Sequence, residues 1–179
     1  ASLTETKVID MAPYGGGINS VAARNGVVAI AVEDTVKTDS GKVVFLDASG
    51  TFLKQVKTGA LPDMITFTPN GKYVLTANEG EPNATYTIDP EGTVTVVDIS
   101  NGVTNAIATT VRFTAFNGNE AALKAQGIRI YGPGANAAKD FEPEYITVSK
   151  NSDIAWITLQ ENNAVAVLDI VNKTFTGVM

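Results

Sequence analysis

Short runs of alternating apolar and polar residues, separated by turn-forming residues, recur along the chain. The clearest matching segments are PDMITFTPNGKYVLTANE, residues 62–79, and PEYITVSKNSDIAWITLQE, residues 143–161. Each is followed by an apolar run that ends in aspartate, at residues 92–98 and 163–169, and a weaker copy spans residues 18–47. Alternation with a period of two is typical of strands with one buried face. The pattern therefore predicts repeated units of short antiparallel strands.

A fourth run completes each unit, at residues 51–58, 106–113 and 173–179. Units of four antiparallel strands that repeat along a chain are typical of β-propeller blades. A β-sandwich gives no reason for a repeat, and the coils of a β-solenoid are shorter. The predicted fold class is all-β, a partial β-propeller of about three four-stranded antiparallel blades with one short helical insertion.

The boundaries of these parts follow from the turn signals. We expect blade 1 at about 18–60, blade 2 at about 61–115, an insertion at about 116–141 and blade 3 at about 142–179. In the insertion, residues 117–127 predict a short helix with Asn117 or Asn119 as its N-cap and Gly127 at its end, and residues 131–143 predict a loop.

Propellers close with about four to eight blades. Residues 1–179 are therefore expected to form a single incomplete propeller segment. The remaining blades of a longer chain, or a second chain, would complete the ring.

The amino-acid composition excludes several kinds of catalytic and metal-binding site. The chain has 179 residues, 44% of them hydrophobic, a net charge of −6, and no cysteine or histidine. This excludes thiol nucleophiles, disulfides and imidazole-based catalysis or metal binding. The acidic balance argues against nucleic acid as a partner, because such partners require clustered Lys and Arg. No apolar run approaches the ~20 residues of a membrane span, so no transmembrane segment is expected.

Carboxylates concentrate in one loop. The segment ANEGEPNATYTIDPEG, residues 77–92, contains four of them and no Lys or Arg. In an antiparallel hairpin, the start of the first strand and the end of the second share an edge of the sheet. That geometry places Asp63 with Glu79 in blade 2 and Glu144 with Glu161 in blade 3. Because Glu33 occupies the corresponding position in blade 1, one face of the predicted propeller should be acidic.

The aspartates that end the third strand of each unit, Asp47, Asp98 and Asp169, belong to the opposite edge. They are expected to accept hydrogen bonds from turn amides, which is a structural role.

Crowded carboxylates repel one another unless a cation lies among them or water screens them. A metal held here would be hard and oxygen-ligated, with Ca²⁺ first and Mg²⁺ or Mn²⁺ next. The candidate ligands are Asp63, Glu79, Glu81, Asp89, Glu91, Glu144 and Glu161. A solvated acidic rim and a catalytic metal site are the alternatives.

Three long segments, GALPDMITFTPNGKYVLTANEGEPN, FTAFNGNEAALKAQGIRIYGPGANAAKDFEPEYI and WITLQENNAVAVLDI, carry a resemblance to a known family. They resemble the bacterial exported proteins of the choice-of-anchor I family. These proteins are similar to mesenchyme-specific cell-surface glycoproteins of biomineralising animals, have YVTN-like repeats and are sometimes labelled alkaline-phosphatase-like. The resemblance implies a propeller that is extracellular, at the cell surface or in the periplasm, and an association with calcium; it carries over no catalytic residue.

Three functions remain open at this point. The favoured one is a non-enzymatic propeller whose acidic face binds Ca²⁺ for a structural, adhesive or mineral-contact role. The second is a metal-dependent phosphoesterase whose active site is completed by further blades; it would need positive charge around the phosphoryl group, and no basic cluster is evident at the acidic edge. The third is a protein-interaction scaffold without an ion.

Overall fold

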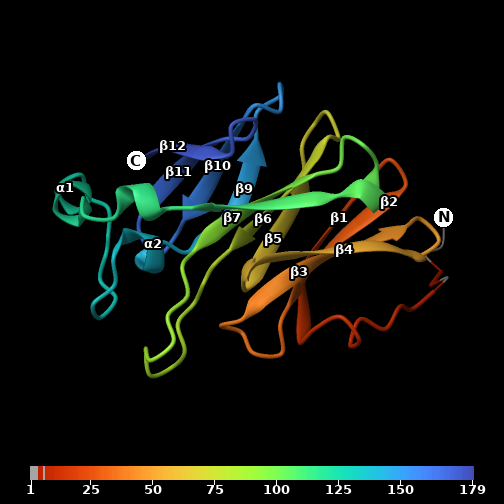
Figure 1. Ribbon diagram of the computed structural model, residues 1–179, viewed down its shortest axis with the longest axis horizontal. Helices are drawn as coiled ribbons and strands as arrows, with labels where there is room; N and C mark the ends of the chain where they lie inside the picture. The colour runs from red at the N-terminus through yellow and green to blue at the C-terminus, as the bar shows by residue number, and fades with distance from the viewer. Residues whose placement is uncertain (1–3, 6) are drawn as a thin grey trace.

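A computed structural model describes residues 4–5 and 7–179 of the protein, and it contains three separate four-stranded sheets (Figure 1). Each sheet is one blade. Blade 1 contains β1 (Gly17–Arg24), β2 (Val27–Glu33), β3 (Ser40–Asp47) and β4 (Phe52–Ala60). Blade 2 contains β5 (Pro62–Phe67), β6 (Tyr73–Asn78), β7 (Thr93–Asp98) and β8 (Ile107–Arg112). Blade 3 contains β9 (Pro143–Val148), β10 (Ile154–Leu159), β11 (Ala164–Asp169) and β12 (Thr174–Val178).

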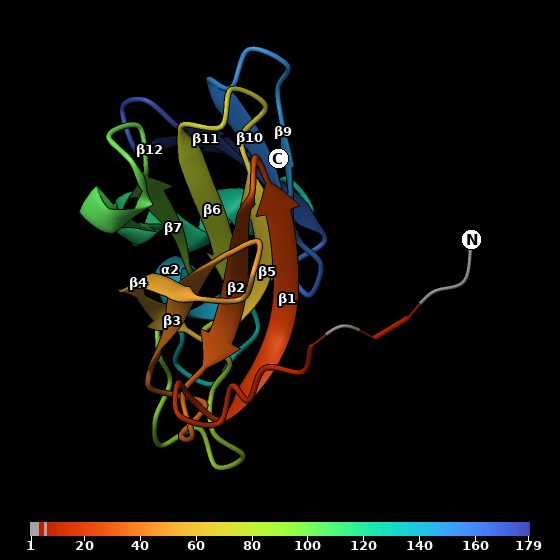
Figure 2. The ribbon, with the colours of Figure 1, turned by 90° about the vertical axis from the view of Figure 1, so that its right-hand side faces the viewer.

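Within every blade the strands follow one another in chain order and pair antiparallel with their neighbours. This arrangement confirms the predicted fold class, a partial propeller of four-stranded blades. The first strands of blades 1 and 2 lie side by side, since the Asn19 side chain donates a hydrogen bond to the Pro62 carbonyl (3.1 Å) and the Ile65 amide donates to Ser20 Oγ (3.2 Å). Figure 2 shows β1, β2 and β5 running next to one another.

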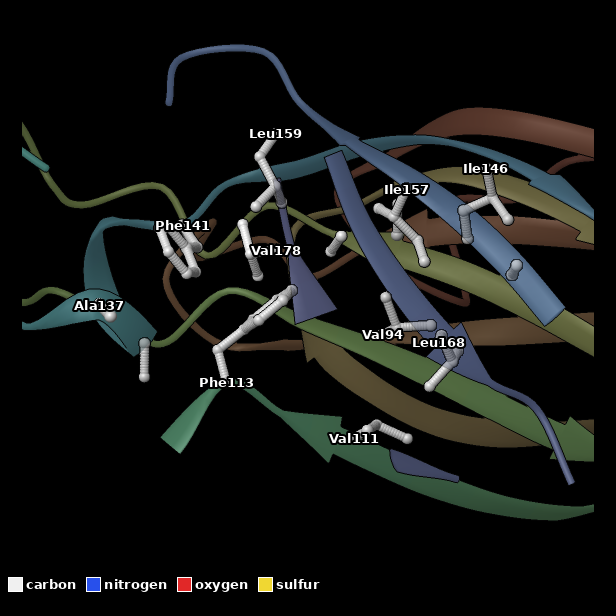
Figure 3. Close-up of a cluster of buried hydrophobic side chains, with 14 of the residues drawn as sticks. Val94, Val111, Phe113, Ala137, Phe141, Ile146, Ile157, Leu159, Leu168 and Val178 are labelled. Atoms are coloured by element: carbon white, nitrogen blue, oxygen red, sulfur yellow. The ribbon is translucent and has the colours of Figure 1, made fainter. Parts of the chain in front are cut away.

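Blade 2 is buried on both faces because it lies between the other two blades. On one face, Val74 and Val97 pack with Val43 and Phe45 of blade 1. On the other face, Leu75 and Val94 belong to a larger cluster with residues of blade 3. Figure 3 shows part of this cluster, with Val94 near Leu168. Two-sided burial explains why five of the six residues in each of β6 and β7 are buried, including threonines and an asparagine that hydrogen-bond to one another.

The insertion between blades 2 and 3 is anchored by aromatic packing. Phe113 stacks on Phe175 of β12 with ring centroids 3.8 Å apart, and it meets Phe141 edge-on at 5.3 Å. Both Phe113 and Phe141 are fully buried. The insertion therefore belongs to the same hydrophobic core as blade 3 rather than forming a separate unit.

The helices of the insertion differ in part from expectation. α1 covers Glu120–Ala125, with Asn119 at the N-cap position but without a side-chain capping hydrogen bond. α2 (Ala137–Asp140) lies where only a loop was expected; Asn136 caps it by accepting a hydrogen bond from the Lys139 amide (3.1 Å). Two 3₁₀ turns, η1 (Val103–Asn105) and η2 (Thr114–Phe116), flank β8. In the part of the chain that the structure describes, no helix is long and apolar enough to cross a membrane.

Candidate functional site

The two edges of the blades carry different chemistry. At one edge, aspartates cap turns: the Asp47 carboxylate accepts hydrogen bonds from the Ser49 and Thr51 amides (both 2.8 Å). Asp98 and Asp169 do the same for turns in blades 2 and 3. Hydrogen bonds from the Ser49 and Ser100 hydroxyls, followed by the turn amides, lower the pKa of Asp47 and Asp98, and the Asn172 amide lowers the pKa of Asp169. The structural role expected for the three aspartates is confirmed.

The opposite edge holds the long connections. The 34–39 loop, the 80–91 loop and the loop of the insertion extend to the same side of the sheets (Figure 1). At this edge Pro62 of β5 pairs with Asn78 of β6, which places Asp63 beside Glu79. In blade 3, Pro143 pairs with Leu159, which places Glu144 near Glu161. Antiparallel pairing thus places carboxylates of blades 2 and 3 at the same edge of the propeller segment.

The charges at this edge act on one another across the blades. Glu33 and Glu79 each interact electrostatically with Asp63. Glu144 interacts with both Glu161 and Asp63. We call the following residues the acidic cluster: Glu33, Asp63, Glu79, Glu81, Glu142, Glu144 and Glu161. Five of the seven sequence-predicted candidates belong to it.

Glu79 and Glu142 are the most strongly perturbed members of the acidic cluster. Burial, followed by the charges of Asp63, Glu81, Glu144 and Glu142, raises the pKa of Glu79 from 4.5 to about 8. Burial and the neighbouring charges, Glu81 first, raise the pKa of Glu142 to about 7. Burial is also the main cause that raises the pKa of Asp63 and Glu144. Glu79 and Glu142 therefore retain protons near neutral pH, in positions where a bound cation would favour the ionised carboxylates.

The other two candidates lie beside cations instead. Glu91 Oε2 is 2.7 Å from Arg112 Nη1, and Asp89 Oδ2 is 3.9 Å from Lys139 Nζ. Burial raises the pKa of Asp89, and Lys139 opposes this effect. A loop without internal Lys or Arg thus receives its positive partners from β8 and α2.

The 80–91 loop is held at both ends. At its start, the Glu79 and Gly80 amides donate hydrogen bonds to the carbonyls of Leu61 (3.0 Å) and Ala60 (3.2 Å). At its end, the Gly92 amide donates to the Ala138 carbonyl (3.0 Å). Glycine is required there, since a Cβ atom on Gly92 would lie 1.8 Å from the Phe141 carbonyl oxygen. The insertion therefore fixes the end of the acidic loop.

A buried polar pair connects the insertion to blade 3 and was not predicted from the sequence. The Asp140 carboxylate accepts hydrogen bonds from the Tyr131 and Gly132 amides and from Asn162 Nδ2 (2.9 Å). Asn162 Oδ1 in turn accepts a hydrogen bond from the Glu142 amide (3.1 Å). This pair positions the backbone of Glu142, the cluster member that sequence reasoning missed. Glu142 immediately precedes Pro143, which starts the first strand of blade 3, and this position is the feature of the sequence that could have identified it.

Basic residues of the insertion border the acidic cluster, although none was expected at this edge. The guanidinium of Arg129 lies 4.7 Å from the centre of the Tyr131 ring. Burial, followed by the charges of Glu142 and Glu161, raises the pKa of Tyr131. Across residues 4–5 and 7–179, however, no group of three or more acidic side chains is arranged to hold a metal ion directly. The cluster is gathered along an edge without forming a closed coordination shell.

Blade topology defines the chain as a segment of a β-propeller. The family model of the choice-of-anchor I domain matches residues 1–179, and the chain belongs to that family. This confirms the resemblance noted in the three sequence segments. A comparison with curated proteins gives no match.

Solved structures that the chain resembles include β-propeller domains. The β-propeller domain of the trilobed protease from Pyrococcus furiosus shares 8% identity at a TM-score of 0.51, over 90% of this chain and 41% of that one. A propeller domain from Myceliophteria thermophila shares 13% identity at 0.53, over 90% and 41%. Hydrazine synthase from Kuenenia stuttgartiensis shares 14% identity at 0.56, over 84% and 39%. At these identities the likeness concerns the fold alone, and the chain spans about two fifths of each of these structures.

Proposed function

We propose that this chain is part of a cell-surface or extracellular propeller whose acidic cluster binds Ca²⁺ and thereby stabilises adjacent blades. The observation that carries the proposal is the half-buried Glu79, which is surrounded by carboxylates and has a pKa raised to about 8. Membership of the choice-of-anchor I family supports the surface location.

Calcium suits this edge better than a smaller cation. It accepts about six to eight oxygen ligands in a flexible geometry, whereas Mg²⁺ requires a near-ideal octahedron. The cluster offers carboxylate oxygens from the start of β5 and from the loop that follows β6 in blade 2, and from the start of β9 in blade 3. Most members are glutamates, whose long side chains can turn inward to complete a coordination shell.

Binding of Ca²⁺ would join blades 2 and 3. Asp63 and Glu79 belong to blade 2, and Glu142 and Glu144 belong to the start of blade 3. A cation shared between them replaces repulsion between the blades with attraction. The resulting role is structural, and a Ca²⁺-loaded acidic surface also suits adhesion or contact with mineral.

Thermal unfolding in the presence and absence of Ca²⁺ tests this proposal. Millimolar Ca²⁺ should raise the Tm in a concentration-dependent way, because a ligand that binds only the folded state stabilises it. Glu142→Gln should reduce this increase. Glu91→Gln is the matched control, since Glu91 is paired with Arg112 outside the cluster; it should leave the increase intact. A Tm that does not respond to Ca²⁺ in the unmodified chain would reject calcium binding.

Further blades would complete the ring. The remaining blades of a longer chain, or a second chain, would cover the outer faces of blades 1 and 3. The fraction of each matched propeller structure that this chain covers, about two fifths, supports this expectation. The mass of the intact polypeptide and its oligomeric state in solution distinguish the two routes.

A metal-dependent phosphoesterase is the second candidate. The observation in its favour is that Arg129 and Lys139 border the acidic edge, because phosphoryl transfer requires positive charge as well as metal. Hydrolysis of p-nitrophenyl phosphate by the complete protein, dependent on added Ca²⁺ or Mg²⁺ and lost in Arg129→Gln, would support it. Absence of hydrolysis with every divalent cation would remove this candidate.

A further inference from the structure

A polar cavity of about 460 Å³ lies between the outer strands of blades 1 and 2. No member of the acidic cluster lines it, and its volume is within the ~300–1,000 Å³ typical of small-molecule sites. The residues that matter for its chemistry are Thr38, Ser40, Lys57, Glu91, Thr110 and Arg112. They come from both blades and from the end of the 80–91 loop.

The two blades approach each other closely at one point of the cavity lining. At the contact, a Cβ atom on Gly59 of β4 would lie only 2.1 Å from Thr93 Oγ1 of β7. Next to the contact, Ala108, Thr110 and Arg112 share one face of β8, because residues two apart in a strand point the same way. The short side chains of Ala108 and Thr110 leave space that Lys57 of β4 borders from the other side.

The charges of the lining favour an anion. The cavity has two cations, Lys57 and Arg112, and one carboxylate, Glu91, in a chain whose net charge is −6. Arg112 donates to Glu91 at 2.7 Å and makes no other side-chain hydrogen bond within the described residues. A guanidinium has five N–H donors, so this contact orients Arg112 and leaves donors for a ligand. Lys57 has no ion pair or hydrogen-bond partner among residues 4–5 and 7–179.

Hydroxyl groups supply the other part of the recognition. Thr38, Ser40 and Thr110 make no side-chain hydrogen bond to the residues that the structure describes. They can therefore donate to, or accept from, hydroxyls of a ligand. One net positive charge matches a single carboxylate better than the two charges of phosphate.

We propose that this cavity binds a sugar acid, a monosaccharide-sized polyol that carries one carboxylate. The carboxylate lies between Lys57 and Arg112, and the ligand hydroxyls bond to Thr38, Ser40 and Thr110. This inference is independent of calcium binding at the acidic cluster, because the two sites share no residue.

NMR titration of the chain with D-glucuronate at constant ionic strength tests the inference. D-Glucose and inorganic phosphate serve as the uncharged and the purely anionic comparisons. Glucuronate at millimolar concentration should saturably shift the backbone amide resonances of Lys57 and Thr110. It should bind at least about tenfold more tightly than glucose or phosphate, because each of these lacks either the charge-assisted contact or the hydroxyl contacts. Equal shifts with glucose, equal affinity for phosphate, or no shifts at the cavity would overturn it.

Variants then assign the contacts. Lys57→Gln and Thr110→Val should each weaken glucuronate binding about tenfold. Lys54→Gln is the matched control, because Lys54 lies on the same strand outside the cavity lining, and it should bind as the unmodified chain does. Equal weakening by Lys54→Gln would show a non-specific charge effect and overturn the site. The amide shifts of the unmodified chain give a readout that does not depend on how any variant folds.

Discussion

Replacing Glu79 with glutamine measures how much free energy of unfolding is lost when Glu79 ionises within the acidic cluster. Glutamine has the shape of the protonated glutamate but never ionises. Because burial and neighbouring carboxylates raise the pKa of Glu79 from 4.5 to about 8, the folded state holds a proton that the unfolded chain releases between these two values. The free energy of unfolding of the unmodified chain should therefore fall as pH rises from 4.5 to 8.

The size of the effect follows from the same pKa values. A change from 4.5 to about 8 corresponds to about 5 kcal/mol, at about 1.36 kcal/mol for each tenfold change in proton affinity. Glu79 is only half-buried, so screening by water reduces this to about 2 kcal/mol. We expect Glu79→Gln to be about 2 kcal/mol more stable than the unmodified chain above pH 8 and equal to it below pH 4.5.

Urea unfolding with a metal chelator present, at a pH below 4.5 and at a pH above 8, measures this difference. Glu91→Gln is the control; it removes an exposed ion pair with Arg112 and should cost at most about 0.5 kcal/mol above pH 8. If Glu79→Gln is less stable than the unmodified chain above pH 8, or if its stability differs equally at both pH values, then ionisation of Glu79 does not destabilise the fold.

Three further predictions concern the parts that hold the acidic edge in place. Gly92→Ala should lower the free energy of unfolding by about 3 kcal/mol in chemical denaturation, because its Cβ would overlap the Phe141 carbonyl; an unchanged unfolding midpoint would show that the loop can move away. Asn162→Ala should cost about 3 kcal/mol, since it leaves Asp140 Oδ2 and the Glu142 amide without their hydrogen-bond partner. Limited proteolysis should then cut the insertion first; cleavage elsewhere would contradict this link. Phe113→Ala should cost about 4 kcal/mol in the same assay because it opens a cavity in the aromatic core; a loss below about 1 kcal/mol would show that the core repacks.

The blades could be predicted from the sequence because the patterns that specify their strands and turns lie within short segments of the chain. Alternation in segments such as 62–79 indicates strands, and turn residues such as Pro69 and Gly71 mark their ends. Antiparallel pairing then follows from short connections. The shared edge of Asp63 and Glu79 was predictable for the same reason, since it depends only on pairing within one hairpin.

The rest of the site depends on contacts between distant segments, which a repeat pattern does not encode. Arg112 follows Glu91 by 21 residues, and its place beside the loop is set by how β8 pairs with β7. Asp140 and Asn162 meet only when the insertion folds against blade 3. An insertion has no counterpart in the other blades, so no comparison within the chain could reveal its second helix or its buried polar pair.

Calorimetric titration of Ca²⁺ at pH 8 into the unmodified chain, Glu142→Gln and Glu91→Gln is the decisive test of calcium binding at the acidic cluster. We expect saturable binding with release of protons from the acidic cluster, at least about tenfold weaker in Glu142→Gln and unchanged in Glu91→Gln. Absence of binding heat in the unmodified chain, or identical binding in all three proteins, would contradict it.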